Sequence, residues 1–264
     1  MCIVTDLTLL IDMGNTRLKW VWAAGGEIDQ STFGRGNRDE FPARCKPPGS
    51  ARPGRVLISS VADQSSTSGV VSTCEERWGA PVKRLQTLRR QDGIVNAYEN
   101  PATLGIDRWL AIIGAAHAYG TPLVIMDLGT ATTLDAVDEQ GRHLGGLILP
   151  GPALMLESLA TATAMPVPTG FGDGEAGNGT TGNKATGPGV GPASSTSEAI
   201  REGVFAAQVG ALNQFMRHVG TKLSKEPRLV LTGGAAECIL DRLESRPVFD
   251  AWLVFKGMLR DQEL

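Results

Sequence analysis

The stretch LLIDMGNT at residues 9–16 returns in altered form as VIMDLGT at residues 124–130. Each copy begins with an apolar run typical of a buried strand, followed by Asp, any residue, Gly and a small hydrogen-bonding residue. The two copies lie about one domain length apart. We therefore expect a duplicated α/β fold in which each half opens with a strand and an Asp-x-Gly turn, with a cleft between the halves.

The residues of these turns are suited to phosphate binding. Gly14 and Gly129 allow a tight turn and present no Cβ that would block a ligand. The Asp at each strand end can hold a hydrated cation, and Lys19 adds positive charge nearby. The amides and hydroxyls that can donate to phosphate oxygens belong to Asn15, Thr16, Thr130 and Thr132. One copy alone could be an ordinary turn between strands. Two copies, with Thr232-Gly233-Gly234 after a late apolar run, favour a nucleotide site.

Hydrophobic periodicity predicts the remaining elements. Apolar runs indicate strands at 17–23, which forms a hairpin with the first strand, and at 55–61, 123–127, 130–137, 143–149 and 228–231. Helices are expected at 101–119 and at 195–217, the second opening with a Ser195–Glu198 capping box, and a weak one at 70–79. Residues 33–54 are interpreted as an irregular connection and the glycine-rich residues 169–193 as a mobile loop.

Composition excludes several classes of protein. The 264 residues include 25 Lys and Arg against 28 Asp and Glu, a formal net charge of −3 that disfavours sequence-independent DNA binding. The 42% hydrophobic and 20% charged content is that of a soluble globular protein. No apolar run reaches the length of a membrane span, and the N-terminus lacks the basic segment of a secretory signal. Four scattered cysteines form no C-x-x-C pair, so they are expected to be reduced.

Two common nucleotide motifs are excluded. The chain has no Gly-Lys dipeptide and therefore no P-loop. Residues 172–177 formally match G-x-G-x-x-G, but they follow no predicted strand and open no predicted helix, so we do not interpret them as a dinucleotide site.

Seven motifs, in order along nearly the whole chain, resemble those of the type III pantothenate kinases, also called Bvg accessory factor homologues. They are Asp12-Met13-Gly14-Asn15-Thr16 with Lys19, Tyr98-Glu99-Asn100-Pro101, Gly105-Ile106-Asp107-Arg108, Asp127-Leu128-Gly129-Thr130-Ala131-Thr132-Thr133, Gly145-Gly146 with Pro150-Gly151, the helix start from Thr196 to Ile200, and Thr232-Gly233-Gly234. Only the connections at 33–54 and 169–193 lie outside the match.

This resemblance implies two ribonuclease-H-like domains of the acetate kinase, sugar kinase, Hsp70 and actin superfamily, here at 1–120 and 121–264, that close on ATP. It implies phosphorylation of pantothenate to 4′-phosphopantothenate, the first step of coenzyme A synthesis. It also implies Mg²⁺, a monovalent cation (K⁺ or NH₄⁺), a homodimer with the pantothenate site near the subunit interface, and a cytoplasmic location. No nucleic acid or membrane partner is expected.

The resemblance also implies roles for individual residues. The first phosphate loop would comprise Asp12, Met13, Gly14, Asn15, Thr16, Arg17, Leu18 and Lys19, with Asp12 near Mg²⁺. Asp127 would bind the monovalent cation, Thr130 the ATP phosphate, and Gly233 and Gly234 would border the adenosine. Asp107 would be the catalytic base. The pantothenate contacts would be Tyr98, Gly105, Ile106, Asp107, Arg108 and Thr196.

The residues alone leave other interpretations open. Asp107 and Thr196 could be helix N-caps, Arg108 could form a surface salt bridge, and Tyr98 could be a packing residue. Two alternative functions also remain: another small-molecule kinase of the same superfamily, and a non-catalytic regulator that binds nucleotide or DNA. The segment Gly105-Ile106-Asp107-Arg108 with Tyr98 disfavours the first, and the net charge disfavours DNA binding.

Overall fold

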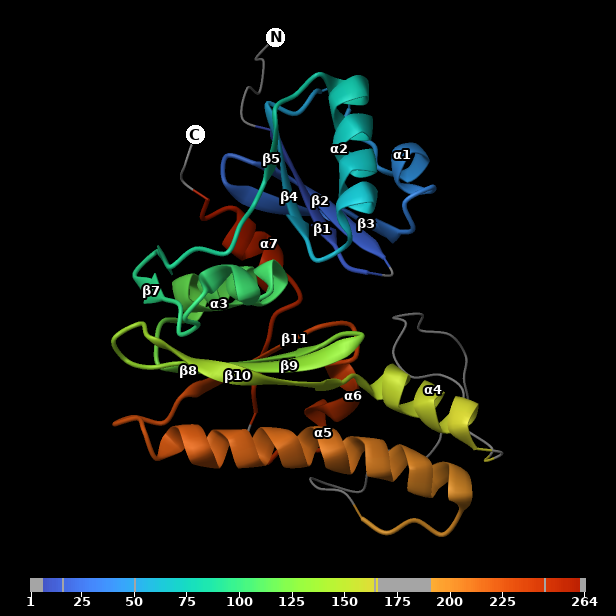
Figure 1. Ribbon diagram of the computed structural model, residues 1–264, viewed down its shortest axis with the longest axis vertical. Coiled ribbons are helices and arrows are strands. Elements are labelled where there is room, and N and C mark those ends of the chain that lie inside the picture. The colour runs from blue at the N-terminus through green and yellow to red at the C-terminus, as the bar shows by residue number, and fades with distance from the viewer. Residues whose placement is uncertain are drawn as a thin grey trace. The chain divides into compact units, whose positions relative to one another are not determined.

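The computed structural model describes residues 7–15, 17–49, 51–163, 165, 191–244 and 246–261 (Figure 1). The chain forms two compact units, one made of Met1–Ala118 with Trp252–Leu264 and the other of Tyr119–Ala251. The division expected from the sequence, after residue 120, places all of residues 121–264 in the second domain. In the structure Trp252–Leu264 groups with the first unit. The first unit is therefore built from two segments that are far apart in the sequence.

The first unit contains a five-stranded mixed sheet in the order β3-β2-β1-β4-β5. Strand β1 pairs antiparallel with β2 and parallel with β4, while β2 pairs antiparallel with β3 and β4 parallel with β5. The strands are β1 (Leu7–Met13), β2 (Leu18–Ala24), β3 (Glu27–Gly36), β4 (Arg55–Ser60) and β5 (Val82–Arg84). The central strands β1, β2 and β4 are nearly continuous buried runs because both sheet faces are covered.

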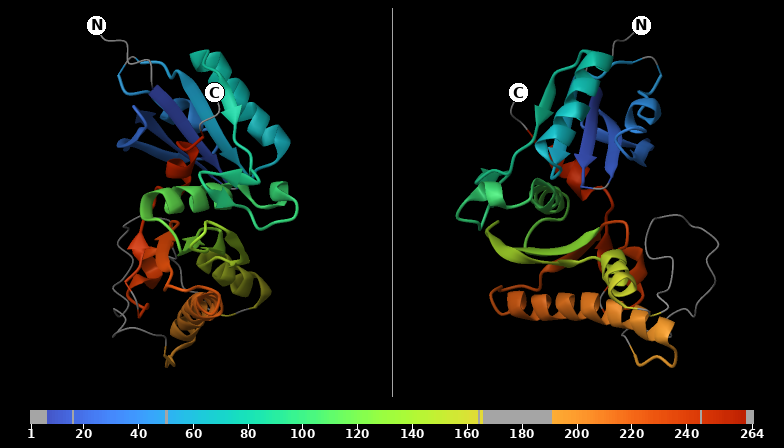
Figure 2. Two further views of the ribbon diagram at one scale, coloured as in Figure 1. Left: turned by 90° about the vertical axis from the view of Figure 1, so that its left-hand side faces the viewer. Right: turned by 45° about the vertical axis from the view of Figure 1, so that its right-hand side comes forward.

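Helix α2 (Gln64–Trp78) lies along one face of this sheet, as both views of Figure 2 show. The helix begins where the Asp63 side chain accepts a hydrogen bond from the Ser66 amide at 2.9 Å, and it ends at Gly79, whose φ of 63° allows a left-handed cap. The rings of Trp22 and Trp78 meet edge to face at 5.7 Å. The short helix α1 (Phe41–Arg44) adds the buried Phe41 to the same core.

Helix α3 (Ile106–Tyr119) and the C-terminal helix α7 (Leu253–Met258) are joined by an unusually close contact. A Cβ on Gly114 would come 2.1 Å from the Leu253 carbonyl oxygen, and one on Gly257 would come 2.0 Å from the Leu110 oxygen. Only glycine permits this approach. The contact helps to hold the C-terminal segment in the first unit, together with the ion pairs Lys83–Asp261 and Asp92–Arg260. Ahead of α3 lie the short strands β6 (Arg90–Gln91) and β7 (Ile94–Val95) and the 3₁₀ turn η1 (Pro101–Thr103).

The second unit repeats the strand order of the first, β10-β9-β8-β11-β12. Strand β8 pairs antiparallel with β9 and parallel with β11, as β1 does with β2 and β4. The strands are β8 (Leu123–Leu128), β9 (Ala131–Val137), β10 (His143–Pro150), β11 (Arg228–Thr232) and β12 (Val248–Phe249). Both sheets therefore open with the strand that ends in Asp-x-Gly, and the expected duplication is confirmed.

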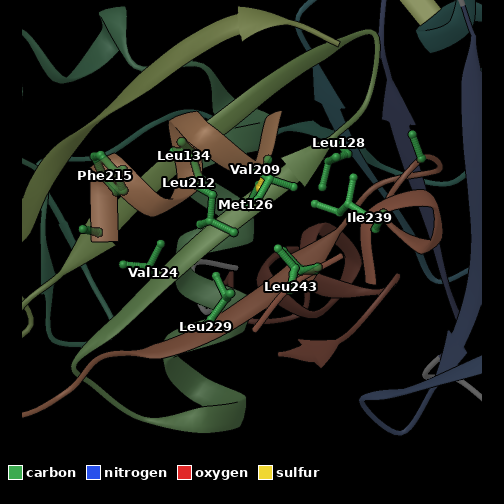
Figure 3. Packing of buried hydrophobic residues seen from close by; sticks show 14 of the residues in the cluster. Val124, Met126, Leu128, Leu134, Val209, Leu212, Phe215, Leu229, Ile239 and Leu243 are labelled. Atoms are coloured by element: carbon green, nitrogen blue, oxygen red, sulfur yellow. The ribbon is translucent and has the colours of Figure 1, made fainter. Parts of the chain in front are cut away.

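Helix α5 (Thr196–Gly220) packs against the second sheet (Figure 1). Its residues Val209, Leu212 and Phe215 meet Val124, Met126 and Leu134 of the strands, with Leu229 and Ile239 completing the core (Figure 3). The Ser195 hydroxyl accepts a hydrogen bond from the Glu198 amide at 3.3 Å, as the capping box predicts. Helices α4 (Pro152–Ala162) and α6 (Glu237–Leu240) complete this unit.

The predicted elements differ from the structure in a few places. The expectation of an irregular connection at 33–54 is wrong in part, because β3 runs to Gly36 and α1 follows. Strand β3 is largely exposed and polar, so it carries no apolar alternation. Helix α2 begins earlier than expected, and the expected elements do not include α4. Most of the predicted mobile loop at 169–193, including the G-x-G-x-x-G match, lies outside the described residues. Among those residues, no helix is long and apolar enough to cross a membrane.

Candidate active site

The hairpin between β1 and β2 forms the first Asp-x-Gly turn. Asp12 lies opposite Lys19 in the strand register, and the Gly14 amide donates to the Arg17 carbonyl at 3.0 Å, which closes the turn. Met13 and Leu18 are fully buried, so their side chains anchor the hairpin in the core. The side chains of Asn15, Arg17 and Lys19 are exposed and accessible to a ligand. Thr16, also predicted for this loop, lies outside the described residues.

Asp12, which carries the carboxyl group of this turn, has a raised pKa. Its pKa is raised from 3.8 to about 6, chiefly by burial and also by the nearby Asp107 carboxylate, while Lys19 and the Ser59 hydroxyl oppose the shift. Ser59 lies opposite Asp12 on the parallel strand β4. Asp12 and Asp107 therefore act on each other within one unit although they are far apart in the sequence. A cation placed beside them would favour their ionised forms.

Asp107 lies in the first turn of α3. Because the helix begins at Ile106, Asp107 is inside it and is not its N-cap. Its Oδ1 accepts a hydrogen bond from the Arg108 amide at 2.8 Å. A Cβ on Gly105 would lie 2.6 Å from that oxygen, so glycine leaves the carboxylate room to fold over the helix start. The positive end of the helix dipole stabilises an ionised carboxylate there.

Arg108 and Tyr98 form a pair beside Asp107. The Arg108 Nη1 donates to the Tyr98 hydroxyl at 3.1 Å, and the guanidinium carbon lies 5.9 Å from the centre of the tyrosine ring. Arg108 is 7% exposed, so it is not the surface residue that a simple salt bridge would require. Ile106, also predicted to contact substrate, is buried at 8% exposure.

The second unit presents an equivalent turn at the end of β8. The Gly129 amide donates to the Ala131 carbonyl at 3.1 Å, and the Gly151 amide donates to the Thr130 carbonyl at 2.9 Å. Gly129 and Thr130 are exposed, whereas Asp127 is half-buried just before them. The second Asp-x-Gly turn therefore repeats the arrangement of the first: a half-buried carboxylate followed by exposed residues of the turn.

Gly233 lies directly against Asp127. Its φ is +94°, and a Cβ there would come within 2.4 Å of the Asp127 Oδ1 and 2.5 Å of the Leu128 carbonyl oxygen. The Ala235 amide donates to the same Leu128 oxygen at 3.0 Å, which fixes the turn. Only glycine fits this conformation and this approach. Gly234 is exposed beside it.

Thr196 is the exposed first residue of α5, and the cap of that helix is Ser195. The N-cap interpretation of Thr196 is therefore wrong, and its side chain is accessible to a ligand.

The structure brings the predicted residues together in two sets. In the first unit these are Asp12 with Lys19 and Asp107, and Tyr98 with Arg108; in the second unit they are Asp127 with Gly233. Ser59 was not predicted, because nothing in the sequence shows that β4 pairs with β1. Among the described residues, no group of three or more His, Cys, Asp or Glu is arranged to hold a metal ion by itself. Any divalent ion here would also need ligands from the phosphates.

The model of the type III pantothenate kinase family matches residues 8–218 of the chain. The chain belongs to the type III pantothenate kinase family. It is 34% identical over 260 residues to the type III pantothenate kinase of Acidovorax ebreus, covering 95% of this chain and 94% of the relative. It is 36% identical over 247 residues to that of Paraburkholderia phymatum, covering 86% and 84%. The enzyme is accordingly a kinase that phosphorylates pantothenate.

Solved structures show the fold of this pantothenate kinase. A putative Baf family transcriptional activator from Campylobacter jejuni aligns with a TM-score of 0.58 at 19% identity, covering 95% of this chain and 94% of that one. The activator of 2-hydroxyisocaproyl-CoA dehydratase from Clostridium difficile gives 0.51 at 12% identity, with 96% and 92% covered. MreB5 of Spiroplasma citri gives 0.50 at 11% identity, with 96% and 95% covered. The fold is therefore the α/β fold of the acetate kinase, sugar kinase, Hsp70 and actin superfamily, with two ribonuclease-H-like units.

Proposed function

We propose that Asp107 is the general base of the reaction, in which the γ-phosphoryl group of ATP passes to the primary hydroxyl of pantothenate to give 4′-phosphopantothenate and ADP. The observation that carries this proposal is that Asp107 is near enough to Asp12 inside the first unit for its charge to raise the pKa of Asp12. One carboxylate belongs to a phosphate turn, and the other stands at a helix start beside a buried arginine. Such an arrangement suits an acceptor hydroxyl and a phosphoryl donor brought close together.

The chemistry asks little of the protein besides position and charge. Phosphoryl transfer has a loose transition state, so catalysis consists mainly of alignment and electrostatic stabilisation. The Asp107 carboxylate accepts the proton of the attacking hydroxyl as the new P–O bond forms and the bond to the leaving ADP oxygen breaks. The start of α3 places the positive end of the helix dipole beside this carboxylate.

Each unit contributes one Asp-x-Gly turn to nucleotide binding in this proposal. Asp12 holds Mg²⁺, whose charge offsets that of the phosphates, and Lys19 adds a further positive charge. Asp127 holds K⁺ or NH₄⁺, Thr130 contacts phosphate, and Gly233 and Gly234 border the adenosine. The fit is supported by the half-buried carboxyl groups and by the exposed backbone of the two turns. It is also supported by Asp12, whose raised pKa a neighbouring cation would lower.

Pantothenate carries a carboxylate, and we assign Arg108 as its partner. A guanidinium binds carboxylates through two parallel hydrogen bonds, which fixes their orientation. The Tyr98 hydroxyl, already hydrogen-bonded to Arg108, orients that guanidinium and offers a further polar contact. We also assign the Gly105 backbone and Thr196 to this substrate.

We further propose that the kinase is a cytoplasmic homodimer. The support for a dimer is β10, an edge strand of the second sheet, where Leu147 and Ile148 are 45% and 65% exposed. Natural edge strands usually carry charges that prevent pairing, and residues 144–150 carry none. The support for the cytoplasm is the use of ATP, together with the thiols of Cys45 and Cys74, which are buried without forming a disulfide.

The decisive experiment is a coupled assay of ADP release with pantothenate as acceptor, with and without K⁺, beside a panel of sugars and small acids. We expect ADP release with pantothenate alone among these acceptors, and stimulation by K⁺. Equal or faster release with a sugar would identify another kinase of the superfamily. Absence of release with every acceptor, despite measurable ATP binding, would identify a non-catalytic regulator.

A further inference from the structure

We propose that Arg89, together with Asn96, is a positioning residue for pantothenate that acts by holding the loop that carries Tyr98. The inference rests on the proposed function, because it takes Tyr98 and Arg108 as the pantothenate-binding pair. Arg89 lies outside every motif on which the family resemblance is based. Its role follows from the hydrogen bonds it makes in the first unit.

The guanidinium of Arg89 donates hydrogen bonds to three backbone carbonyl oxygens of one loop. Its Nη1 donates to the carbonyl oxygens of Asn96 at 3.3 Å and Tyr98 at 2.6 Å, and its Nη2 donates to the carbonyl oxygen of Glu99. The planar fork of an arginine can serve several carbonyls at once, which a lysine cannot do with the same geometry. Arg89 therefore fixes the backbone on both sides of the Tyr98 side chain.

Asn96 fixes the same loop from the inside. It is 2% exposed, and its Oδ1 accepts a hydrogen bond from the Tyr98 amide at 2.9 Å. Its own amide donates to the Arg89 carbonyl at 3.0 Å, and its Nδ2 donates to the Leu88 carbonyl at 3.4 Å. Arg89 and Asn96 thus hold each other and Tyr98 in a closed set of hydrogen bonds.

The small hairpin between these two residues is itself attached to rigid structure. The Trp109 Nε1 of α3 donates to the Gln91 Oε1 at 2.8 Å, and Trp109 is fully buried. At the tip of the hairpin, Asp92 forms an ion pair with Arg260, which follows α7. The hairpin therefore stays in place when Arg89 is replaced, and only the loop beyond it loses its support.

Replacing Arg89 should affect the binding of pantothenate but not that of ATP. Tyr98 reaches Arg108 through a hydrogen bond of 3.1 Å and through the contact of its ring with the guanidinium, and both depend on where the loop holds the tyrosine. The residues assigned to ATP lie on other elements, at the ends of β1, β8 and β11 and at the start of β2. Loss of Arg89 should therefore weaken pantothenate binding while leaving ATP binding and the transfer step nearly unchanged.

The test compares Arg89→Ala, Arg89→Lys and Tyr98→Phe with the wild type, in steady-state kinetics and in calorimetric titration with pantothenate. Arg89→Ala should raise the KM and the Kd for pantothenate about tenfold, with kcat and the KM for ATP within about twofold. Arg89→Lys should restore part of the loss. The matched control is Arg90→Ala, since the exposed Arg90 side chain makes no hydrogen bond or ion pair within the described part of the chain; it should behave as the wild type.

A double variant tests whether Arg89 acts through Tyr98. If it does, combining Arg89→Ala with Tyr98→Phe should cost much less than the product of the two separate effects. Independent effects, or an unchanged pantothenate KM in Arg89→Ala, would overturn the inference while leaving the proposed function intact. An unchanged pantothenate KM in both Tyr98→Phe and Arg108→Met would instead remove the assigned binding pair. If Arg89→Ala does not fold, the Arg89→Lys measurements decide by the same criteria.

Discussion

Asp12 and Asp107 have different surroundings within the first unit. Asp12 is shielded and its pKa lies near 6, whereas Asp107 stands where the helix dipole favours its charged form. A base must be ionised before it can accept a proton. A carboxylate whose negative charge the protein stabilises poorly is the one that a bound cation stabilises most. The two positions therefore suit the two different roles proposed for them.

Asp107→Asn should lower kcat at least ~10²-fold, because the attacking hydroxyl loses its proton acceptor. The amide keeps the size and shape of the carboxylate, so the nucleotide turns are undisturbed and ATP affinity should change little. Steady-state kinetics with pantothenate, together with titration of a non-hydrolysable ATP analogue, measure the two quantities. Turnover like that of the wild type would exclude Asp107 as the base.

Asp12→Asn should stabilise the ligand-free protein at neutral pH. The folded-state pKa of about 6 exceeds the value of about 3.9 in an unfolded chain, so the folded state binds the proton more tightly. The stability contributed by this group is complete below about pH 4 and is lost as the pH rises through about 6. The Tm advantage of the variant should therefore grow from about pH 4 to pH 6 and then stay level.

Calorimetry without nucleotide or divalent ions measures this pH dependence. The control is Asp39→Asn, which removes one charge from an exposed position. A Tm difference that is the same at every pH, or that disappears at neutral pH, would contradict the buried environment described for Asp12.

Asp127→Ala should abolish activation by K⁺, because the proposed monovalent-cation ligand is removed. Activity at zero K⁺ provides the internal reference, and a titration with K⁺ and then with NH₄⁺ measures the response. Activation as strong as in the wild type would place the cation elsewhere.

At the scale of elements, the contact between α3 and α7 depends on two glycines. An added Cβ at either Gly114 or Gly257 would meet a backbone carbonyl at a distance that no side-chain movement can relieve. This backbone contact attaches the last helix to α3, which carries Asp107 in its first turn. The position of Asp107 is therefore supported by residues almost at the other end of the sequence.

Gly257→Ala should lower the free energy of unfolding by about 1–3 kcal/mol, the usual cost of overpacking a well-filled core. The matched substitution is Gly210→Ala in α5, where an added Cβ meets no atom within 4 Å. That variant should be unchanged or more stable by up to about 1 kcal/mol, because alanine favours helix. Urea denaturation measures both. Equal midpoints for Gly257→Ala and wild type would show that the helices can separate without cost.

The strands and long helices could be predicted wherever apolar residues recur with a clear period, as in β1, β8, α3 and α5. Strand β3 could not be predicted in this way, because it has no alternation of apolar and polar residues. Its position in the sheet comes from its pairing with β2. The two Asp-x-Gly turns were visible as a repeat in the sequence. Three features depend on contacts between segments, which the spacing of motifs does not reveal. They are the nearness of Asp107 to Asp12, the position of Ser59 beside Asp12, and the hydrogen bonds of Arg89 and Asn96 to the loop that carries Tyr98.

At the scale of the whole molecule, the same five-strand order occurs twice. The two sheets differ at their outer strands: β3 carries the charges of Glu27, Asp29 and Arg35 beside one exposed apolar side chain, whereas β10 displays Leu147 and Ile148 with no charge next to them. An exposed apolar edge strand tends to pair with another chain unless it is covered. The second sheet, and not the first, therefore has the edge suited to a second copy of the kinase.

Ile148→Glu should convert a dimer into monomers. The dimer dissociation constant should rise at least ~10-fold, since burying an isoleucine contributes about 1.5–3 kcal/mol. Sedimentation equilibrium measures this change. Ser72→Glu, on the exposed side of α2, adds the same charge away from β10 and should leave the association unchanged. A dimer of wild-type strength in Ile148→Glu would place the interface on another surface.

The discontinuous first unit has a consequence for synthesis on the ribosome. Residues Tyr119–Ala251 form a continuous unit that can acquire its structure as soon as it emerges from the exit tunnel. The contact between Gly114 and Leu253 forms later, because Leu253 is made only after the whole second unit has been translated. A premature stop after Ala251 would thus leave the later-made half correctly packed and the earlier-made half lacking α7, with the nascent helix around Asp107 open to proteases.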